Sequence, residues 1–390
     1  MYRAFRVLVV LPVLFLFSIV AVSQTTPSSE NGFKPYGSYD GSAIDSVNLM
    51  NGNVMLHAPL LPSYPQRGSL KPQDILYLTS LNWTVKCAPG CFWVYGGTGV
   101  IDQNPLYIGV SRTLETDAGS GVQQTSYAYN YALTMPDGQT SLLYPIPSSL
   151  TSGQYLSFES IDTSGYRVDV SNLDQYGAPQ SGSVTDRHGN RYNISKFTGA
   201  CHTTISPDGT STTLCSQNAT IDTVTDPNGN VYTLGSVAGL DTLGRTPPFT
   251  TGTTTTDYSG CITSNGPIAR ASTYNYSAPD GTTKQVKWCY ATVQLQTSFN
   301  QSGVQEVQNS NGQSPTSIQE VATIILADGN KWTFAYDSYG DVTSIGLPTG
   351  GSIAYTWTTV SLDNCNRFSK LSRAVATRTT SANVYPWQYT

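Results

Sequence analysis

A short turn unit built on Asp-Gly or Asn-Gly recurs six times along the chain, and it constrains the fold more than any other feature. Glycine in such a unit supplies the positive φ angle that a tight hairpin turn requires, and the neighbouring β-branched and aromatic residues favour strands. The six units lie at residues 136–139, 185–192, 207–210, 225–232, 279–282 and 327–332. Gly189, Gly209 and Gly229 are 20 residues apart. This spacing, with one hairpin in each unit, predicts a stacked array of hairpins and argues against a compact enzyme domain.

The first residues have the features of an export signal. Arg3 and Arg6 form a basic start, an apolar run extends over 7–22, and small residues around Ser23 suit cleavage by a signal peptidase. We therefore predict a signal peptide over 1–23 and a mature chain that is secreted or held at the cell surface. An uncleaved anchor is the alternative, but the apolar run is short for a hydrocarbon core about 30 Å thick.

Composition narrows the class of partner. Charged residues make up 12% of the 390 residues, about half of the ~25% usual in globular proteins. The 25 tyrosines and 6 tryptophans nevertheless argue against disorder, and hydroxyl and amide side chains suit the outward positions of an exported β protein. The net charge is −5 and Lys and Arg do not cluster, so we expect no nucleic-acid partner and no membrane contact beyond the export signal.

The clearest single unit runs over 328–357. A strand of alternating large and small residues leads into one turn, and a return strand leads into a second. The two turns read Asp337-Ser338-Tyr339-Gly340 and Leu347-Pro348-Thr349-Gly350-Gly351. This pattern resembles the YD repeat of the bacterial Rhs family, and the segment 31–68 is similar to one that often precedes the repeats in exported members. The resemblance implies hairpins wound into a large spiral sheet, which in long members closes into a shell that carries a C-terminal toxin, while other members act in adhesion.

These signals predict an all-β fold, in which repeated hairpins form an extended or spiral antiparallel sheet after a smaller N-terminal β region. We expect this N-terminal region, with a flexible lead-in, over 24–125. A YD-like hairpin region follows over 126–360, interrupted by a loop near 240–267. The last segment, 361–390, stops within a strand-like alternation, so we interpret it as the truncated start of a further β segment.

Seven cysteines in an exported chain are expected to form disulfides where geometry allows. Three pairs flank turn sequences: Cys87 with Cys91, Cys201 with Cys215, and Cys261 with Cys289. Cys365 is then left alone. A zinc site is the alternative, but tightly spaced sets of four ligands are absent and the chain has only 3 histidines.

One polar segment suits a cation. Asp226, Asn228 and Asn230 alternate as oxygen donors for Ca²⁺, but they lack the further carboxylates and the closing Glu of a calcium loop. Turn structure accounts for the same three residues without a ligand. We therefore favour the turn and predict no metal site and no cofactor.

Signals for catalysis are weaker still. His188 and His202 lie near Asp186 and Asp208 in the sequence, but at turns or beside a cysteine, where solvated polar residues are ordinary. The glycine-rich stretches at 37–41 and 96–99 lack the strand–helix context of a nucleophile elbow or a phosphate-binding loop. No pair of carboxylates can be selected for glycoside hydrolysis. We therefore predict no catalytic residue and no enzymatic activity.

The tryptophans allow two interpretations. They could stack on sugar rings at a glycan-binding surface, or they could form the cross-strand aromatic pairs that stabilise sheets by roughly 0.2–1 kcal/mol each. Repetition of aromatic residues along a sheet favours the second. The tryptophans are Trp83, Trp93, Trp288, Trp332, Trp357 and Trp387.

Together the observations predict an exported, non-enzymatic scaffold of the YD-repeat type. It would act in surface interaction or adhesion, or as the N-terminal part of a toxin-carrying shell. Its partner would be an unidentified protein or glycan, or an enclosed C-terminal cargo. A carbohydrate-binding β module is the first alternative, and a secreted enzyme acting on glycans is the second.

Overall fold

The computed structural model describes most of the chain between Phe33 and Tyr389. The described residues are 33, 37–59, 67–68, 70, 75–87, 89–96, 101–103, 109–118, 125–135, 139–151, 154–173, 179–205, 211–219, 221–233, 241–244, 252–278, 280–361 and 371–389. They contain antiparallel strands and two short 3₁₀ helices, which confirms the predicted all-β fold. The predicted signal peptide, Asp208 and Cys365 lie outside the described residues.

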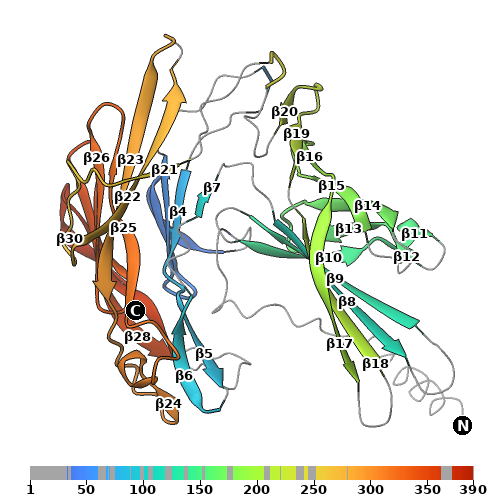
Figure 1. The fold of residues 1–390 in the computed structure, drawn as a ribbon, viewed down its shortest axis with the longest axis horizontal. Coiled ribbons are helices and arrows are strands. Elements are labelled where there is room, and N and C mark those ends of the chain that lie inside the picture. Colours follow the sequence, from blue (N-terminus) through green and yellow to red (C-terminus); the bar gives the residue numbers. More distant parts are fainter. Residues whose placement is uncertain are drawn as a thin grey trace, which may run out of the picture.

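Strands from the two ends of the chain build one unit, which we call the sandwich unit (residues 37–103 and 252–389). Its N-terminal strands are β1 (Tyr39–Gly41), β2 (Asp45–Asn48), β3 (Val54–Pro59), β4 (Ile75–Thr79), β5 (Trp83–Cys87), β6 (Cys91–Tyr95) and β7 (Ile101–Gln103). Its C-terminal elements are β21 (Thr253–Thr255), β22 (Ile268–Ser277), β23 (Thr283–Gln294), β24 (Val304–Gln305), η3 (Val307–Asn309), β25 (Ser317–Ile325), β26 (Lys331–Tyr336), β27 (Val342–Gly346), β28 (Ser352–Ser361), β29 (Leu371–Thr380) and β30 (Asn383–Gln388). In Figure 1 the blue N-terminal strands lie directly beside the orange and red ones.

The core of the sandwich unit lies between a five-stranded sheet, in the order β1-β2-β3-β4-β7, and a nine-stranded sheet, β21-β22-β23-β25-β26-β27-β28-β29-β30. Buried and less buried residues alternate along the strands, which gives each sheet one apolar face. In β26 every second residue is buried, from Trp332 to Tyr336, and in β4 the buried residues are Leu76 and Leu78. Side chains of both sheets form one continuous cluster. The N-terminal strands therefore share their core with the end of the chain.

A second contact joins the ends of the chain at the side of the sandwich unit. There β24 pairs in parallel with β6, which pairs with β5 in a three-stranded sheet. Trp83 and Trp93 from the N-terminal hairpin pack with Phe299 of the C-terminal segment, and the Trp93 and Phe299 rings stack at 4.0 Å. The N-terminal hairpin could not bury this small core without the C-terminal segment.

The middle of the chain (residues 109–233) forms a curled antiparallel sheet of eleven strands, which we call the middle sheet. Its strands lie in the order β17-β18-β8-β9-β10-β13-β14-β15-β16-β19-β20. Their bounds are β8 (Gly109–Ala118), β9 (Thr125–Thr134), β10 (Thr140–Pro145), β13 (Ser157–Ser160), β14 (Arg167–Leu173), β15 (Pro179–Thr185), β16 (Arg191–Ile194), β17 (Phe197–Ile205), β18 (Ser211–Ala219), β19 (Thr223–Thr225) and β20 (Val231–Thr233). The small elements η2 (Pro147–Ser149), β11 (Leu150–Thr151) and β12 (Gln154–Tyr155) lie between β10 and β13.

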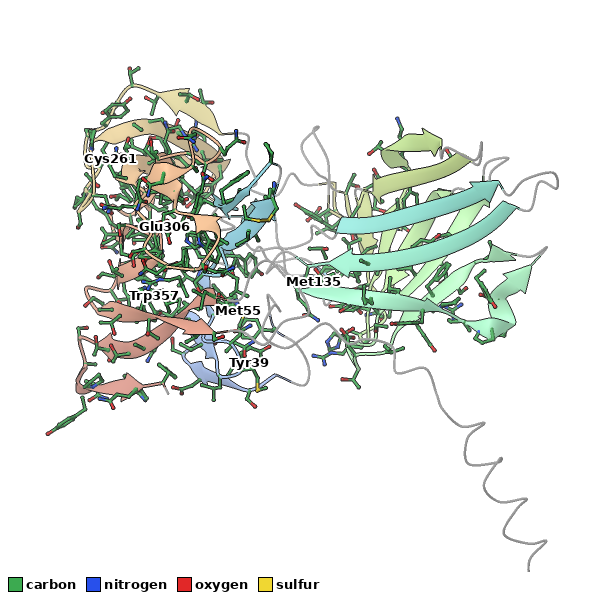
Figure 2. The ribbon with its side chains drawn as sticks, turned by 90° about the horizontal axis from the view of Figure 1, so that it is seen from below. Tyr39, Met55, Met135, Cys261, Glu306 and Trp357 are labelled. Atoms are coloured by element: carbon green, nitrogen blue, oxygen red, sulfur yellow. A yellow bond between two sulfur atoms is a disulfide. The ribbon has the colours of Figure 1, made fainter. Side chains whose placement is uncertain are left out.

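The middle sheet has its own core, and it begins earlier than the hairpin region expected from 126 onwards, because β8 already belongs to it. Tyr131, Leu133, Phe158 and Val168 are buried in one cluster. Leu70, from the segment between β3 and β4, packs into the same cluster, so the N-terminal chain touches both units. Figure 2 shows Met55, Cys261 and Trp357 in one group of strands and Met135 in the other.

All six predicted turn units connect consecutive, paired antiparallel strands, which confirms the predicted hairpins. Their order along the chain is not their order in space. The hairpin β17–β18 crosses to pair with β8, and β16 pairs directly with β19. The 20-residue spacing of Gly189, Gly209 and Gly229 is therefore not a spacing between neighbouring units, because the hairpin that contains Gly209 joins the opposite end of the sheet.

Candidate functional site

Six hairpin turns share one backbone geometry. The first residue of each turn donates its N–H to the carbonyl of the fifth, at 2.8–3.0 Å, and the glycine at the fourth position donates back to the first, at 2.9–3.1 Å. The glycines have φ between 77° and 91°. This is a three-residue loop with its last residue in the left-handed region, a geometry that favours glycine. The turns span 186–190, 226–230, 278–282, 326–330, 337–341 and 347–351.

Aspartates at the start of these turns accept hydrogen bonds from backbone N–H groups of the same turn. Asp226 accepts the N–H groups of Asn228 and Asn230 at 2.9 Å each, and the Asn230 amide donates to the same carboxylate at 2.9 Å. The candidate calcium ligands therefore form a turn, as we favoured. Within the part of the chain that the structure describes, no group of three or more His, Cys, Asp or Glu residues is placed to hold a metal ion.

The candidate acid–base group is arranged in the same way. Asp186 accepts the N–H groups of His188 and Asn190 at 2.8 and 2.9 Å, and the Tyr192 hydroxyl at 3.2 Å. His188 is exposed on the turn, where its ring accepts a hydrogen bond from Arg187. His202 lies in β17, more than ten residues away along the chain. The described residues thus give Asp186 a structural role.

A third turn of this kind carries a buried charge cluster. At its fifth position Asp341 stands where two turns of the middle sheet have an asparagine. Asp341 is fully buried, and burial together with the neighbouring Asp337 carboxylate raises its pKa to about 8. Arg373 opposes this shift by donating to Asp341 at 2.9 Å and to Asp337 at 3.0 Å, and its guanidinium lies 4.1 Å from the centre of the Tyr339 ring. The cluster lines neither of the cavities described below, and it connects the turn at 337–341 to β29.

A second buried ion pair connects the two ends of the chain. Arg378 of β29 donates two hydrogen bonds to Asp45 of β2, at 2.6 and 2.7 Å, and Tyr355 of β28 donates a third at 2.6 Å. Burial acts to raise the pKa of Asp45, but the hydrogen bonds from Arg378, Ser42 and Tyr355 outweigh it and hold the pKa below its usual value. Asp45 is therefore a charged group held inside the sandwich core.

The tryptophans are mainly core residues. Trp83, Trp93, Trp288 and Trp332 are at most 8% exposed, which leaves no ring face free for a sugar. Trp357 packs against the sandwich core and donates to the Val342 carbonyl at 2.9 Å. Trp387 alone of the six is exposed, at 37%, and Arg378 lies over its ring. The four buried tryptophans therefore have the structural role that we favoured.

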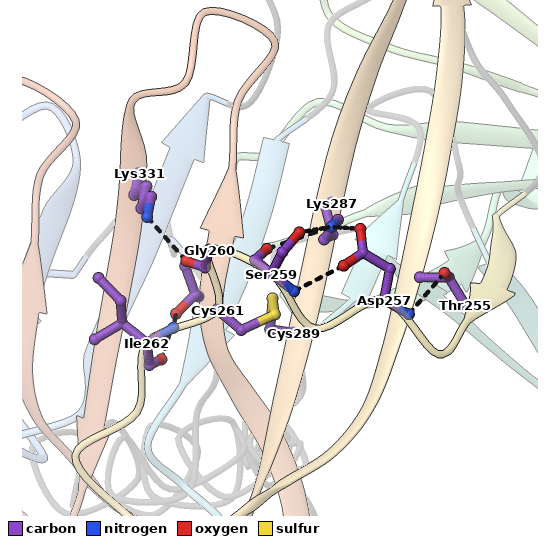
Figure 3. The surroundings of a disulfide bond; sticks show 10 residues. Thr255, Asp257, Ser259, Gly260, Cys261, Ile262, Lys287, Cys289 and Lys331 are labelled. Atoms are coloured by element: carbon purple, nitrogen blue, oxygen red, sulfur yellow. Dashed lines mark hydrogen bonds and ion pairs between the residues drawn. A yellow bond between two sulfur atoms is a disulfide. The ribbon is translucent and has the colours of Figure 1, made fainter.

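Two of the predicted disulfides are present. Cys87 and Cys91 close the β5–β6 hairpin, and Cys261 is bonded to Cys289 of β23. Cys201 and Cys215 stand opposite one another in the β17–β18 register, as the third predicted pair requires of the backbone. Figure 3 shows how the Cys261 segment is fastened to the sheet.

The segment around Cys261 belongs to the interruption predicted near 240–267. Lys287 of β23 donates to Asp257 at 2.5 Å and to Ser259 at 3.3 Å, and Lys331 of β26 donates to the Gly260 carbonyl at 2.9 Å (Figure 3). The hydrogen bonds from Lys287 and Ser259 lower the pKa of Asp257. The described part of this loop around Cys261 is mostly exposed, and it is held against the sheet by a disulfide and by charged groups.

The described residues of the glycine-rich stretches show no catalytic geometry. Gly41 ends the short strand β1, and the residues from Tyr39 onwards pair with β2, so the stretch 37–41 lacks a nucleophile turn. Gly96 follows β6, and the residues 97–99 lie outside the described part. Among the described residues, no helix has the length and apolar character needed to cross a membrane.

Two cavities, one in each unit, are lined by described residues. One of about 10 Å³ lies between the sheets of the sandwich, beside Leu56, Leu78 and Trp357, and has room for about one water molecule. The other is a shallow polar concavity of about 490 Å³ on the middle sheet, over β14, β15, β16 and β19. Its polar lining includes Asp169, Arg191, Asn193 and Asp222. None of these was selected from the sequence, because each is a single polar residue in or next to an ordinary strand.

Neither a scan of protein-family models nor a search of the curated proteins finds a match to this chain. The resemblance of residues 328–357 to a YD repeat therefore rests on the turn pattern alone and stays a prediction.

Proposed function

We propose that the protein is an exported, non-enzymatic scaffold of the YD-repeat type that acts in interactions at the cell surface. The observation that carries the proposal is the recurrence of one hairpin turn at six places in two sheets. In three of these turns the starting aspartate is occupied by backbone N–H groups, so the conspicuous acids of the sequence serve the fold. A chain whose repeated residues all build hairpins suits a supporting role.

The disulfides are consistent with this location. Cys87–Cys91 and Cys261–Cys289 are bonds of the kind that form and persist in oxidising compartments. The basic and apolar residues over 1–23 supply the export signal in this proposal. A scaffold outside the cell also gains from covalent closure of its loops, because a disulfide stabilises the folded state by constraining the unfolded chain.

Detection of the native polypeptide tests the proposal. Antibodies against residues 24–390 are applied to the medium, to intact cells and to cell lysate, and the captured species is analysed by mass spectrometry without reduction. We expect a species in the medium or on the surface that lacks residues 1–23 and carries disulfides. A species that stays inside the cell with its leader and with free thiols would overturn the proposal. An intact mass far above 41.9 kDa would place this scaffold at the front of a longer shell, whereas a mass near that value would favour a self-contained surface protein.

A further inference from the structure

The polar concavity of the middle sheet is formed by a row of side chains that the strand register brings together. Asp169 of β14 stands opposite Ser183 of β15, Ser183 stands opposite Asn193 of β16, and Asn193 stands opposite Thr223 of β19. Neighbouring strands are about 4.8 Å apart, so the row presents a carboxylate, two hydroxyls and an amide at regular intervals across four strands. All four residues line the concavity.

This row lies on the face opposite the core. Val168, Val184 and Val224, which alternate with the row along their strands, are buried in the apolar cluster of the middle sheet. The outward face of an antiparallel sheet is ordinarily exposed to solvent. Here Ser183 is only 2% exposed, which shows that the face is hollowed at this point. Its hydroxyl makes no hydrogen bond to another described residue, and it lines the concavity. This hydroxyl is therefore available to exchange hydrogen bonds with a ligand that occupies the concavity.

Arg191 gives the concavity its free cation. It lines the concavity, its side chain is exposed, and it forms no ion pair or hydrogen bond with a described residue. Arg167, on the same face, is different: it donates to Asp169 at 2.9 Å and forms an ion pair with it at 2.8 Å. The Asp169 charge is thus already neutralised, and the Arg191 guanidinium is left to receive an anionic group in a bidentate manner.

The remaining polar groups suit hydroxyls. Asp222 lines the concavity with a carboxylate that accepts the Ser195 N–H and retains further acceptor capacity. The Ser171 and Ser181 hydroxyls, 3.0 Å apart, extend the lining at one side. A phosphate chain is disfavoured because Arg191 is a single cation beside a carboxylate, and phosphate binding needs grouped cations.

We propose that this concavity binds an acidic saccharide. Arg191 holds the sugar carboxylate, and Ser183, Asn193 and Asp222 exchange hydrogen bonds with ring hydroxyls. This inference goes beyond the scaffold proposal and is independent of it, because it concerns only the purified chain. It also places any glycan on the polar face of the middle sheet and away from the tryptophans.

The test is binding of oligouronates. The purified full chain, without residues 1–23, is applied to an array of oligogalacturonates, oligoglucuronates and sialylated oligosaccharides, together with methyl-esterified or neutral counterparts of the same sugars. The tightest acidic probe is then titrated by calorimetry. We expect acidic probes to bind and their esterified counterparts to bind at least about tenfold more weakly, because esterification removes the negative charge to which Arg191 would bind.

Three variants locate the site. Arg191→Gln should lower the affinity for the acidic probe at least about tenfold, and the variant should no longer prefer this probe to its ester. Ser183→Ala should lower the affinity for both probes. Arg187→Gln removes an exposed arginine from the adjoining turn, outside the lining, and should leave binding unchanged. Unfolding curves of all variants show whether each is folded. Absence of binding to every acidic probe, or equal affinities of the Arg191→Gln and Arg187→Gln proteins, would overturn the proposal.

Discussion

Arg378 and Asp45 form a buried, doubly hydrogen-bonded ion pair although they are 333 residues apart in the sequence. Asp45 is fully buried and Arg378 is 4% exposed. The pair joins β2 to β29, and it lies beside the core that both ends share. The sandwich unit is therefore complete only when the C-terminal third of the chain is present.

Removal of one partner of this pair should destabilise the protein strongly. Arg378→Met leaves the Asp45 carboxylate buried without its cation, for which we expect a loss of roughly 3–5 kcal/mol in the free energy of unfolding, measured with urea. Arg187→Met, at an exposed turn, serves as the control and should change stability by less than about 0.5 kcal/mol. The double variant Asp45→Leu/Arg378→Met should recover part of the loss, because no charge then stays buried alone. Equal stabilities of Arg378→Met and the wild type would contradict the role of the pair.

The two described disulfides should differ in their effect on stability. Cys261–Cys289 closes a loop with a sequence separation of 28, for which the chain-entropy model gives a stabilisation of roughly 3–4 kcal/mol. Cys87–Cys91 closes a loop with a separation of 4, for which the same model gives about 2 kcal/mol. We therefore expect the Cys261→Ser/Cys289→Ser protein to unfold at lower urea than Cys87→Ser/Cys91→Ser. The reverse order would show that loop closure is not the main contribution of these bonds.

A pair of glycine variants separates backbone strain from steric conflict. Gly68 and Gly229 have nearly equal φ angles of 78° and 80°, but a Cβ on Gly229 meets no atom within 4 Å, whereas one on Gly68 would overlap the Asp226 carboxylate and the Asn230 amide. Gly229→Ala should lower the free energy of unfolding by about 1–2 kcal/mol, the ordinary penalty for a side chain in the left-handed conformation. Gly68→Ala should lower it more, because the turn at 226–230 must move to make room for the added Cβ.

Thermal unfolding of both variants measures the difference. Gly96→Ala is the control, since its φ is not in the left-handed region and its added Cβ would meet only the Asn82 carbonyl, at 3.4 Å. If Gly68→Ala and Gly229→Ala lower the melting temperature equally, the contact between Gly68 and the turn contributes nothing to stability.

Asp341 should make the protein less stable as the pH rises. Its folded-state pKa of about 8 lies above the unfolded value of 3.8, so the folded state binds a proton that the unfolded state releases between these values. The stabilisation that this proton brings is complete below about pH 4 and is lost as the pH rises through about 8. We expect this group to lower the free energy of unfolding by up to a few kcal/mol across that window.

Asp341→Asn tests the sign of this effect. Asparagine occupies the same turn position at Asn190 and Asn230, so the backbone geometry tolerates it. Unfolding by urea is followed at several values between pH 5 and pH 9 for both proteins. The variant should lose less stability than the wild type over this range. Parallel curves would mean that the Asp341 carboxyl does not titrate between these values.

The turns could be predicted from the sequence because their geometry depends on few residues. Gly189 and Gly229 each sit in a five-residue segment that begins with an aspartate, and both have the positive φ that the sequence led us to expect. The disulfides Cys87–Cys91 and Cys261–Cys289 were predicted for a related reason, since each pair flanks a turn. The polar row from Asp169 to Thr223 could not be predicted, because it exists only through the register of four strands.

The amino-acid sequence by itself determined which segments are strands and where they reverse, since alternation of side chains and the φ preference of glycine act within a few residues. Only the tertiary structure decided which sheet each hairpin joins. It placed β17–β18 beside β8, and it set the N-terminal strands against the C-terminal sheet. These choices depend on the burial of whole apolar faces and on single long-range partners such as Asp45 and Arg378. No local pattern carries that information, because a strand with one apolar face is compatible with many sheets.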